Sequence, residues 1–277
     1  MPTPIDVPHA AAIVLVSALG GAANSVAGGG TLLTFPAIVA LGVSPVVANA
    51  TSTVALWPGA LSSLWGYRAE VAGARSWARR VALPSAVGGL IGAWLLLAGG
   101  DEWFTRLVPW LVLGATLLFV AQRPLLALAA RRRARAPAAP SGPSGPSQPE
   151  PVAAGTTVAA PDARAVVFQL LVAVYGGYFG AGAGILTLAA LGLSGLTNIH
   201  QMNGLKNFTA LCFNAVAIAA YAASAAVDWR LAALLAVGTA AGGYAAAGLA
   251  RRAPQAVVRN LVAVIGFGSA AWLWVRR

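Results

Sequence analysis

The chain has a single lysine, Lys206, and three asparagines stand near it in an otherwise apolar stretch. If that stretch is a helix, the side chains of Asn203, Lys206, Asn207 and Asn214 fall within one sector of about 100°. An ammonium group and amide groups donate hydrogen bonds, and a small oxyanion needs donors. These residues therefore predict an anion-binding face.

A similar polar stripe occurs earlier in the chain, where Asn49, Ser52 and Thr53 share one helical face. When the two halves of the sequence are aligned, residues 51–53 stand opposite residues 205–207, so a hydroxyl group matches the position of the lysine. The stripe would add neutral donors to the one positive charge. The alternative interpretation is that the lysine extends to a membrane interface, while the Asn and Ser residues join helices.

The elements that must position these side chains are apolar segments of membrane-spanning length. Hydrophobic residues make up 58% of the 277-residue chain and charged residues 9%, with a mean hydropathy of +0.76. A soluble domain carries about 25% charged residues, so a bilayer is the expected surrounding. The apolar stretches are 10–42, 45–66, 80–98, 103–122, 164–193, 203–226, 229–250 and 255–275.

Two of these stretches, 10–42 and 164–193, are interrupted by glycines near their middle. Each is too long for one span of about 20 residues and too short for two full spans and a turn. We therefore expect two short or re-entrant helices in each, because irregular backbone inside a bilayer must line a cavity or be covered by protein. Paired breaks of this kind are typical of a transporter site. Close helix packing is the alternative explanation of the glycines.

Acidic side chains are absent from all of these stretches. Cation-coupled carriers commonly use carboxylates inside the membrane as relays, so a site without them and with a positive bias suits an anion. Cys212 is the only cysteine, and His9 and His200 are isolated in sequence. This pattern predicts no metal site, and we expect no cofactor. The seven acidic residues are Asp6, Glu70, Asp101, Glu102, Glu150, Asp162 and Asp228.

The two halves of the chain resemble each other. Residues 27–34 match residues 181–188, and both segments lie in a glycine-interrupted stretch. Between the halves, residues 131–163 are rich in Pro, Ser, Gly and Arg and lack the large apolar side chains that would offset ordering entropy, which predicts a disordered linker. The expected organisation is a first transmembrane repeat over 1–130, this linker over 131–163, and a second transmembrane repeat over 164–277.

Arginine clusters predict the orientation of the chain in a membrane. By the positive-inside rule, residues 67–80 and the linker should be cytoplasmic and Asp101 should lie outside. In the second half the positive loop moves by one position, to the arginines at 251–252. An inverted repeat requires this shift, provided that each long stretch enters and leaves on the same side. The arginines at 276–277 would then lie outside, against the rule.

Two other classes of function fit the sequence poorly. The net charge of +11 is distributed in short clusters between apolar stretches, so we do not expect nucleic acid as a partner. Residues 192–195 fit the Gly-x-Ser-Gly pattern of rhomboid-type intramembrane proteases, but no histidine follows His200 to act as a base for Ser194. We therefore expect no catalytic residues and no enzyme, and a structural scaffold is the other non-transport alternative.

Several short segments of the chain carry a resemblance to a known family. They are Asn24 to Gly30, Pro36, Leu41 to Pro45, Ala48 to Ser52, Gly176 to Gly184 and Met202 to Asn207. In these motifs the chain resembles the TauE/SafE family of sulfite exporters, over nearly its whole length apart from the linker and the N-terminal tail. The resemblance implies a membrane transporter that moves sulfite or other sulfur-containing anions, including organosulfonates, out of the bacterial cytoplasm.

We therefore predict an all-α integral membrane protein in which two homologous halves form an inverted repeat with Gly-broken or re-entrant helices. We expect a multi-pass protein of the bacterial inner (cell) membrane that exports a small anion, with a channel-like anion facilitator as the alternative. Its expected partners are the anion and the lipid bilayer, and the sequence leaves open a homo-oligomer. The candidate substrate-binding residues are Asn24, Gly28, Gly29, Gly30, Asn49, Thr51, Ser52, Thr53, Gly182, Gly184, Asn203, Lys206, Asn207 and Asn214.

Overall fold

The chain is helical, as predicted, in the parts that its structure describes. The structure is a computed structural model, and it describes residues 7–27, 29–134, 161–196, 198–249 and 255–275. No strand occurs within these ranges. The helices are α1 (Val7–Ala27), α2 (Thr31–Ala40), α3 (Pro45–Gly66), α4 (Arg68–Gly73), α5 (Arg75–Ala134), α6 (Ala163–Tyr178), α7 (Ala183–Leu193), α8 (Ile199–Ala223), α9 (Trp229–Leu249) and α10 (Gln255–Val275).

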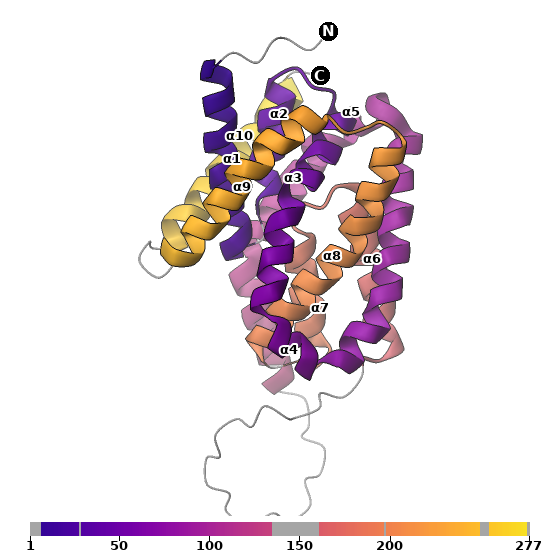
Figure 1. Cartoon of the computed structure of the whole chain (residues 1–277). Helices are drawn as coiled ribbons and strands as arrows, with labels where there is room; N and C mark the ends of the chain where they lie inside the picture. Colours follow the sequence, from indigo (N-terminus) through magenta and orange to yellow (C-terminus); the bar gives the residue numbers. More distant parts are fainter. Residues whose placement is uncertain (1–6, 28, 135–160, 197, 250–254, 276–277) are drawn as a thin grey trace, which may run out of the picture.

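Local sequence explains where several of these helices begin and turn. α3 starts with Pro45, and proline suits the first helical position because its missing N–H would have no partner there. The side chains of Asp162 and Asn198 accept hydrogen bonds from backbone N–H groups in the first turns of α6 and α8. Gly100 interrupts α5 with a φ of 68°, a left-handed value that favours glycine. The chain therefore turns back at Gly100, and α5 consists of two helices (Figure 1).

Two hydrogen bonds define the two ends of the molecule. At one end, Nη1 of Arg80 donates to the backbone oxygen of Pro161 at 3.1 Å, which brings the starts of α5 and α6 together. We call this the linker end. At the other end, the N–H of Val46 donates to Oδ1 of Asp101 at 3.0 Å, which joins the start of α3 to the turn in α5. We call this the opposite end, and α1 begins and α10 ends there (Figure 1).

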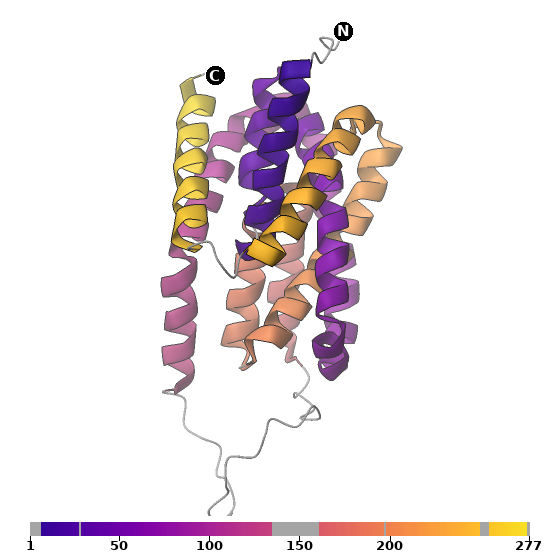
Figure 2. The ribbon, with the colours of Figure 1, turned by 60° about the vertical axis from the view of Figure 1, so that its left-hand side comes forward.

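Each long apolar stretch of the sequence folds into a pair of helices. α1 enters from the opposite end and stops at Ala27, and α2 begins at Thr31 and returns to that end (Figures 1 and 2). α6 enters from the linker end and α7 returns to it, since Leu191 of α7 belongs to the same apolar cluster as Trp77 of α5 and Met202 of α8. The two pairs therefore enter from opposite ends. An inverted repeat needs this arrangement, and the repeat symmetry itself stays a prediction.

Small residues allow helices of the two halves to approach closely. A Cβ atom built on Gly177 of α6 would lie 2.3 Å from the backbone oxygen of Gly89 in α5. A Cβ atom on Gly242 of α9 would lie 1.8 Å from the backbone oxygen of Ala18 in α1. Close crossings of this kind are common between helices in membranes. The α5–α6 and α1–α9 contacts therefore hold the first half against the second.

The lengths of the helices can be compared with the predicted spans. By length and composition, two of the described helical segments are long and apolar enough for a bilayer, Arg75–Ala121, which turns back at Gly100, and Ile199–Ala223. Six shorter apolar segments of 10–17 residues accompany them. The predicted stretches 45–66 and 255–275 coincide with α3 and α10. The predicted linker lies mostly outside the described residues, although α5 continues through Ala134. The arginines at 251–252 and 276–277 also lie outside them.

Candidate functional site

A cavity of about 850 Å³ lies between α3 and α8. The breaks of both helix pairs reach it, through Thr31 at the start of α2 and Ala183 at the start of α7, while Gly21 of α1 and Thr239 of α9 add a further wall. The lining extends to Tyr67, directly after α3, so the cavity reaches the linker end. Helices from both halves of the chain therefore enclose one cavity.

The predicted polar face of α8 forms one wall of this cavity. Asn203, Lys206, Asn207 and Asn214 all line it. The cap at Asn198 fixes where the helix starts. The structure therefore brings together the four residues that helical periodicity grouped.

Lys206 reaches the cavity past the break between α6 and α7. A Cβ atom built on Gly184 would lie 3.3 Å from Cδ of Lys206, so the missing side chain at Gly184 leaves room for the lysine stem. Gly184 also lines the cavity. Among the residues that the structure describes, no carboxylate forms an ion pair with Lys206. Its ammonium group is therefore a positive charge without a protein counter-ion there.

Hydroxyl groups of α3 face the cavity from the other side. Thr53, Ser62 and Ser63 line it, as does Asn24 near the end of α1. Oγ1 of Thr53 donates to the backbone oxygen of Asn49 at 2.8 Å, and Ser62 makes a similar bond within its own helix. A hydroxyl can exchange such a local bond for a bond to a ligand by rotating. Seven of the predicted residues thus meet here, namely Asn24, Thr53, Gly184, Asn203, Lys206, Asn207 and Asn214.

Three predicted residues of α3 do not line the cavity. Asn49, Thr51 and Ser52 are at most 1% exposed. Nδ2 of Asn49 donates to the backbone oxygen of Tyr178 at 3.1 Å, and Oγ1 of Thr51 accepts from the N–H of Asp228 at 3.1 Å. The Ser52 hydroxyl pairs with a threonine hydroxyl of α2. These residues lie nearer to the opposite end, where other segments cover α3, so the polar stripe of α3 is divided between the cavity and a closed region.

Two of the predicted glycines serve close packing in this structure. Gly29 and Gly30 do not line the cavity, since a Cβ atom on them would lie 2.7 Å from an aromatic ring of α5 and 2.8 Å from a backbone oxygen of α1, respectively. Gly182 precedes α7 with a φ of 80°, which favours glycine, and it also lies outside the lining. Gly28 lies outside the described residues.

Sequence reasoning did not single out several lining residues. Thr31, Ser62, Tyr67 and Thr239 contribute polar groups to the cavity. Oγ1 of Thr239 donates to the backbone oxygen of Ala55 at 2.7 Å, a contact between α9 and α3. Thr239 is the only hydroxyl-bearing residue between positions 230 and 244. An isolated hydroxyl in an apolar span was therefore the signal that could have identified it.

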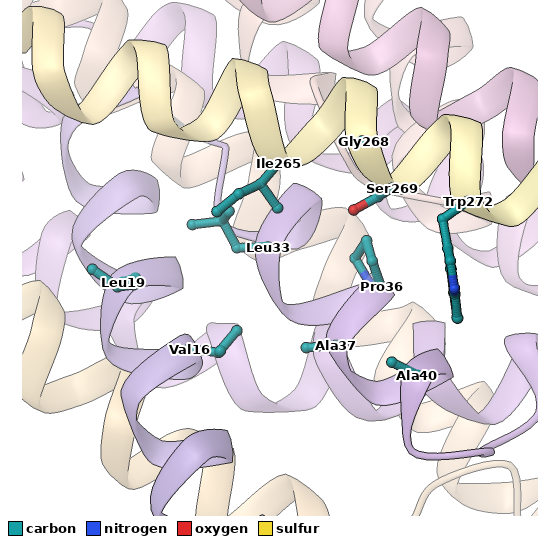
Figure 3. Close-up of a pocket in the computed structure, with 10 residues that line it drawn as sticks. All are labelled: Val16, Leu19, Leu33, Pro36, Ala37, Ala40, Ile265, Gly268, Ser269 and Trp272. Carbon is teal, nitrogen blue, oxygen red and sulfur yellow. The ribbon is translucent and has the colours of Figure 1, made fainter.

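A second pocket, of about 400 Å³, lies between α1, α2 and α10. Figure 3 shows that Leu33, Ile265 and Pro36 surround it together with other apolar side chains, and that Ser269 and Trp272 carry its polar atoms. No charged residue lines it. A pocket of this kind would leave an anion dehydrated and uncompensated, so the cavity beside Lys206 is the candidate site for an anion.

Comparison with known proteins identifies the family of the chain. The family described as sulfite exporter TauE/SafE matches residues 13–273, nearly the whole length. No curated protein and no solved structure gives a match. The family consists of transporters of sulfur-containing anions and is not a family of enzymes, so it does not favour the protease alternative. The chain belongs to the TauE/SafE family of sulfite exporters.

Proposed function

We propose that this chain is a multi-pass protein of the bacterial inner membrane that exports sulfite or a related sulfur-containing oxyanion or organosulfonate. The observation that carries the proposal is the position of Lys206, which lines the cavity and has no carboxylate partner among the described residues. Family membership supports the transport of sulfur-containing anions.

The charge and the donors of the cavity favour an anion over a cation. An ammonium group in a partly dehydrated cavity is stabilised by an opposite charge, and the described residues offer none. Asn203 and Asn207 add amide donors on the same wall, and Thr53 adds a hydroxyl across from them. A cation in the cavity would be repelled by the ammonium group of Lys206 and would find no carboxylate ligand among the described residues. The cavity therefore favours anions over cations.

The size and lining of the cavity also admit an organic group. A volume of about 850 Å³ exceeds what a small inorganic oxyanion fills. Leu56 and Phe213 lie in the lining beside the polar residues, and they could cover the carbon chain of an organosulfonate while Lys206 binds its sulfonate. This combination supports a substrate class of sulfur-containing anions that extends beyond sulfite.

A carrier fits the geometry better than a channel-like facilitator. The cavity reaches the linker end, while buried contacts of Asn49 and Thr51 close α3 against the second half nearer to the opposite end. A channel needs a continuous path. Arg79 and Arg80 at the linker end favour a cytoplasmic location for that end, so the cavity would collect its substrate from the cytoplasm, as an exporter requires.

Reconstitution into liposomes tests this proposal. Liposomes loaded with sulfite or with a two-carbon organosulfonate should release it faster when they contain the protein, and external substrate should accelerate release if the protein is a carrier. Lys206→Met should abolish most of this flux. Arg106→Met is the matched control, because Arg106 is exposed and pairs with Glu102 away from the cavity. Absence of flux with both substrates from folded protein would contradict the proposal.

A further inference from the structure

The cavity is closed toward the opposite end by hydrogen bonds between segments, two of which join the two halves of the chain. Asn49, in the second turn of α3, donates from Nδ2 to the backbone oxygen of Tyr178, the last residue of α6, at 3.1 Å. Thr51 accepts from the N–H of Asp228, which precedes α9, at 3.1 Å. The hydroxyl of Tyr221 in α8 donates to the backbone oxygen of Gly177. Each of these bonds uses a side chain on one segment and a backbone group on another.

Four aromatic rings pack beside these hydrogen bonds. Phe35 of α2 contacts Phe179, in the break after α6, with ring centroids 5.5 Å apart, and Phe104 of α5 contacts Tyr178 at the same centroid distance. Further edge-to-face contacts join Phe104 to Phe35 and to Phe179. Phe35, Phe104 and Phe179 are at most 1% exposed. We call these four rings the aromatic seal, because edge-to-face packing of buried rings leaves little room for water.

Asn49 carries an unsatisfied polar atom within this closed region. The residue is 1% exposed, and its Oδ1 has no hydrogen-bond partner among the described residues. A buried acceptor without a donor is unfavourable. Its counterpart in the alignment of the two halves, Asn203, lines the open cavity. The same residue type therefore occupies an open position in one half and a closed, incompletely paired position in the other.

We propose that Asn49 and the aromatic seal form the gate of this transporter at the opposite end, and that the structure holds this gate closed. When the gate opens, the bond from Asn49 to Tyr178 breaks and the ring of Phe179 leaves Phe35. Asn49, Thr51 and Ser52 then face the substrate on its way out. This inference rests on the proposed function, because a gate has a purpose only in a protein that moves a solute.

Accessibility of a single thiol to a membrane-impermeant maleimide tests the gate. Cys212 is the only cysteine, so Cys212→Ser provides a thiol-free background for a Thr31→Cys reporter at the cavity wall. The reagent is applied separately to the two faces of the membrane, which Ala69→Cys and Glu102→Cys identify as the linker end and the opposite end. The reporter should react from the linker end and not from the opposite end.

Two variants should open the gate. Asn49→Ala removes the donor to Tyr178, and Phe179→Ala removes a ring from the seal. Losing one ordinary hydrogen bond should raise labelling of the reporter from the opposite end roughly two- to tenfold, and the double variant should raise it further. Gln169→Ala and Trp77→Ala are the matched controls. They remove a buried amide that donates to Ser85 and a buried ring of the apolar cluster at the linker end, and they should leave labelling from the opposite end unchanged.

Labelling also separates this inference from the proposed function, because it needs no substrate. Unchanged labelling from the opposite end in folded gate variants would overturn the gate, as would equal labelling from both ends in the parent protein. If the alanine variants fail to fold, Asn49→Asp and Phe179→Leu carry the same test with less loss of volume. A protein that shows gated labelling but no flux of either sulfite or the two-carbon organosulfonate would keep the gate and contradict the proposed function.

Discussion

The stem of Lys206 lies against Gly184, where a Cβ atom would stand 3.3 Å from the lysine Cδ. Gly184 is the second residue of α7, directly after the break between α6 and α7. The charge of the cavity is thus positioned by the absence of a side chain on a neighbouring helix. This relationship links the glycine-interrupted stretch of the sequence to its only lysine.

Enlarging Gly184 should therefore displace Lys206. Gly184→Ala needs a shift of only a few tenths of an ångström and should change sulfite affinity little, whereas Gly184→Val should weaken it roughly tenfold through loss of a charge-assisted hydrogen bond. Gly59→Val is the matched control, since Gly59 lines the same cavity and a Cβ atom there meets nothing within 4 Å. Calorimetric titration with sulfite measures the effect. If both valine variants weakened sulfite affinity equally, the effect of Gly184→Val would not come from displacement of Lys206.

The crossing of α5 and α6 should be sensitive to a single methyl group. A Cβ atom on Gly177 would lie 2.3 Å from the backbone oxygen of Gly89, so Gly177→Ala must push the two helices apart. Overpacking of this kind costs about 1–3 kcal/mol of the free energy of unfolding. Gly114→Ala, where a Cβ atom meets nothing within 4 Å, should be neutral or slightly stabilising. Thermal unfolding in detergent should separate the two variants, and identical transitions would count against the tight crossing.

Helical periodicity grouped residues that line the cavity on α8, but on α3 it also grouped residues that do not. On α8, the sector of Asn203, Lys206, Asn207 and Asn214 depends only on helical geometry, and all four residues line the cavity. On α3, the same reasoning could not tell which part of the polar stripe the rest of the protein covers. Tertiary contacts such as the bond between Asn49 and Tyr178 decide this, and periodicity does not contain them.

The glycines show a similar limit. Their positions predicted that the long stretches would be interrupted, and α1 ends at Ala27 while α2 begins at Thr31. Whether a given glycine faces a cavity or a neighbouring helix depends on partners that are distant in sequence. Gly184 faces both the cavity and Lys206, while a Cβ atom on Gly29 would collide with the ring of Phe119. The role of each glycine therefore could not be predicted from the sequence alone.

Removal of Ala136 to Ala160 should leave folding and transport largely intact. This segment lies outside the described residues, and its Pro-, Ser- and Gly-rich composition predicts that it buries little surface. The two halves also hold each other through the α5–α6 and α1–α9 crossings, so a shorter connection need not weaken them. Expression level, monodispersity and sulfite flux of the deletion variant provide the measurement. Loss of assembly would show that the segment has a structural role.

The strongest test of the site is the charge of Lys206. Lys206→Met keeps most of the length and the apolar stem but removes the ammonium group, so it should lose a charge-assisted hydrogen bond of about 1.5–3 kcal/mol, or roughly ten- to more than a hundredfold in anion affinity. Thermal stability should change little, because no carboxylate among the described residues would lose a partner. Lys206→Arg should restore binding only in part, since a planar guanidinium does not replace a compact ammonium group beside Gly184.

If the lysine only extended to the membrane interface, Lys206→Met would be harmless and Lys206→Arg fully active. Sulfite titrations of both variants distinguish these outcomes, and unchanged affinity of Lys206→Met would remove the residue from the site.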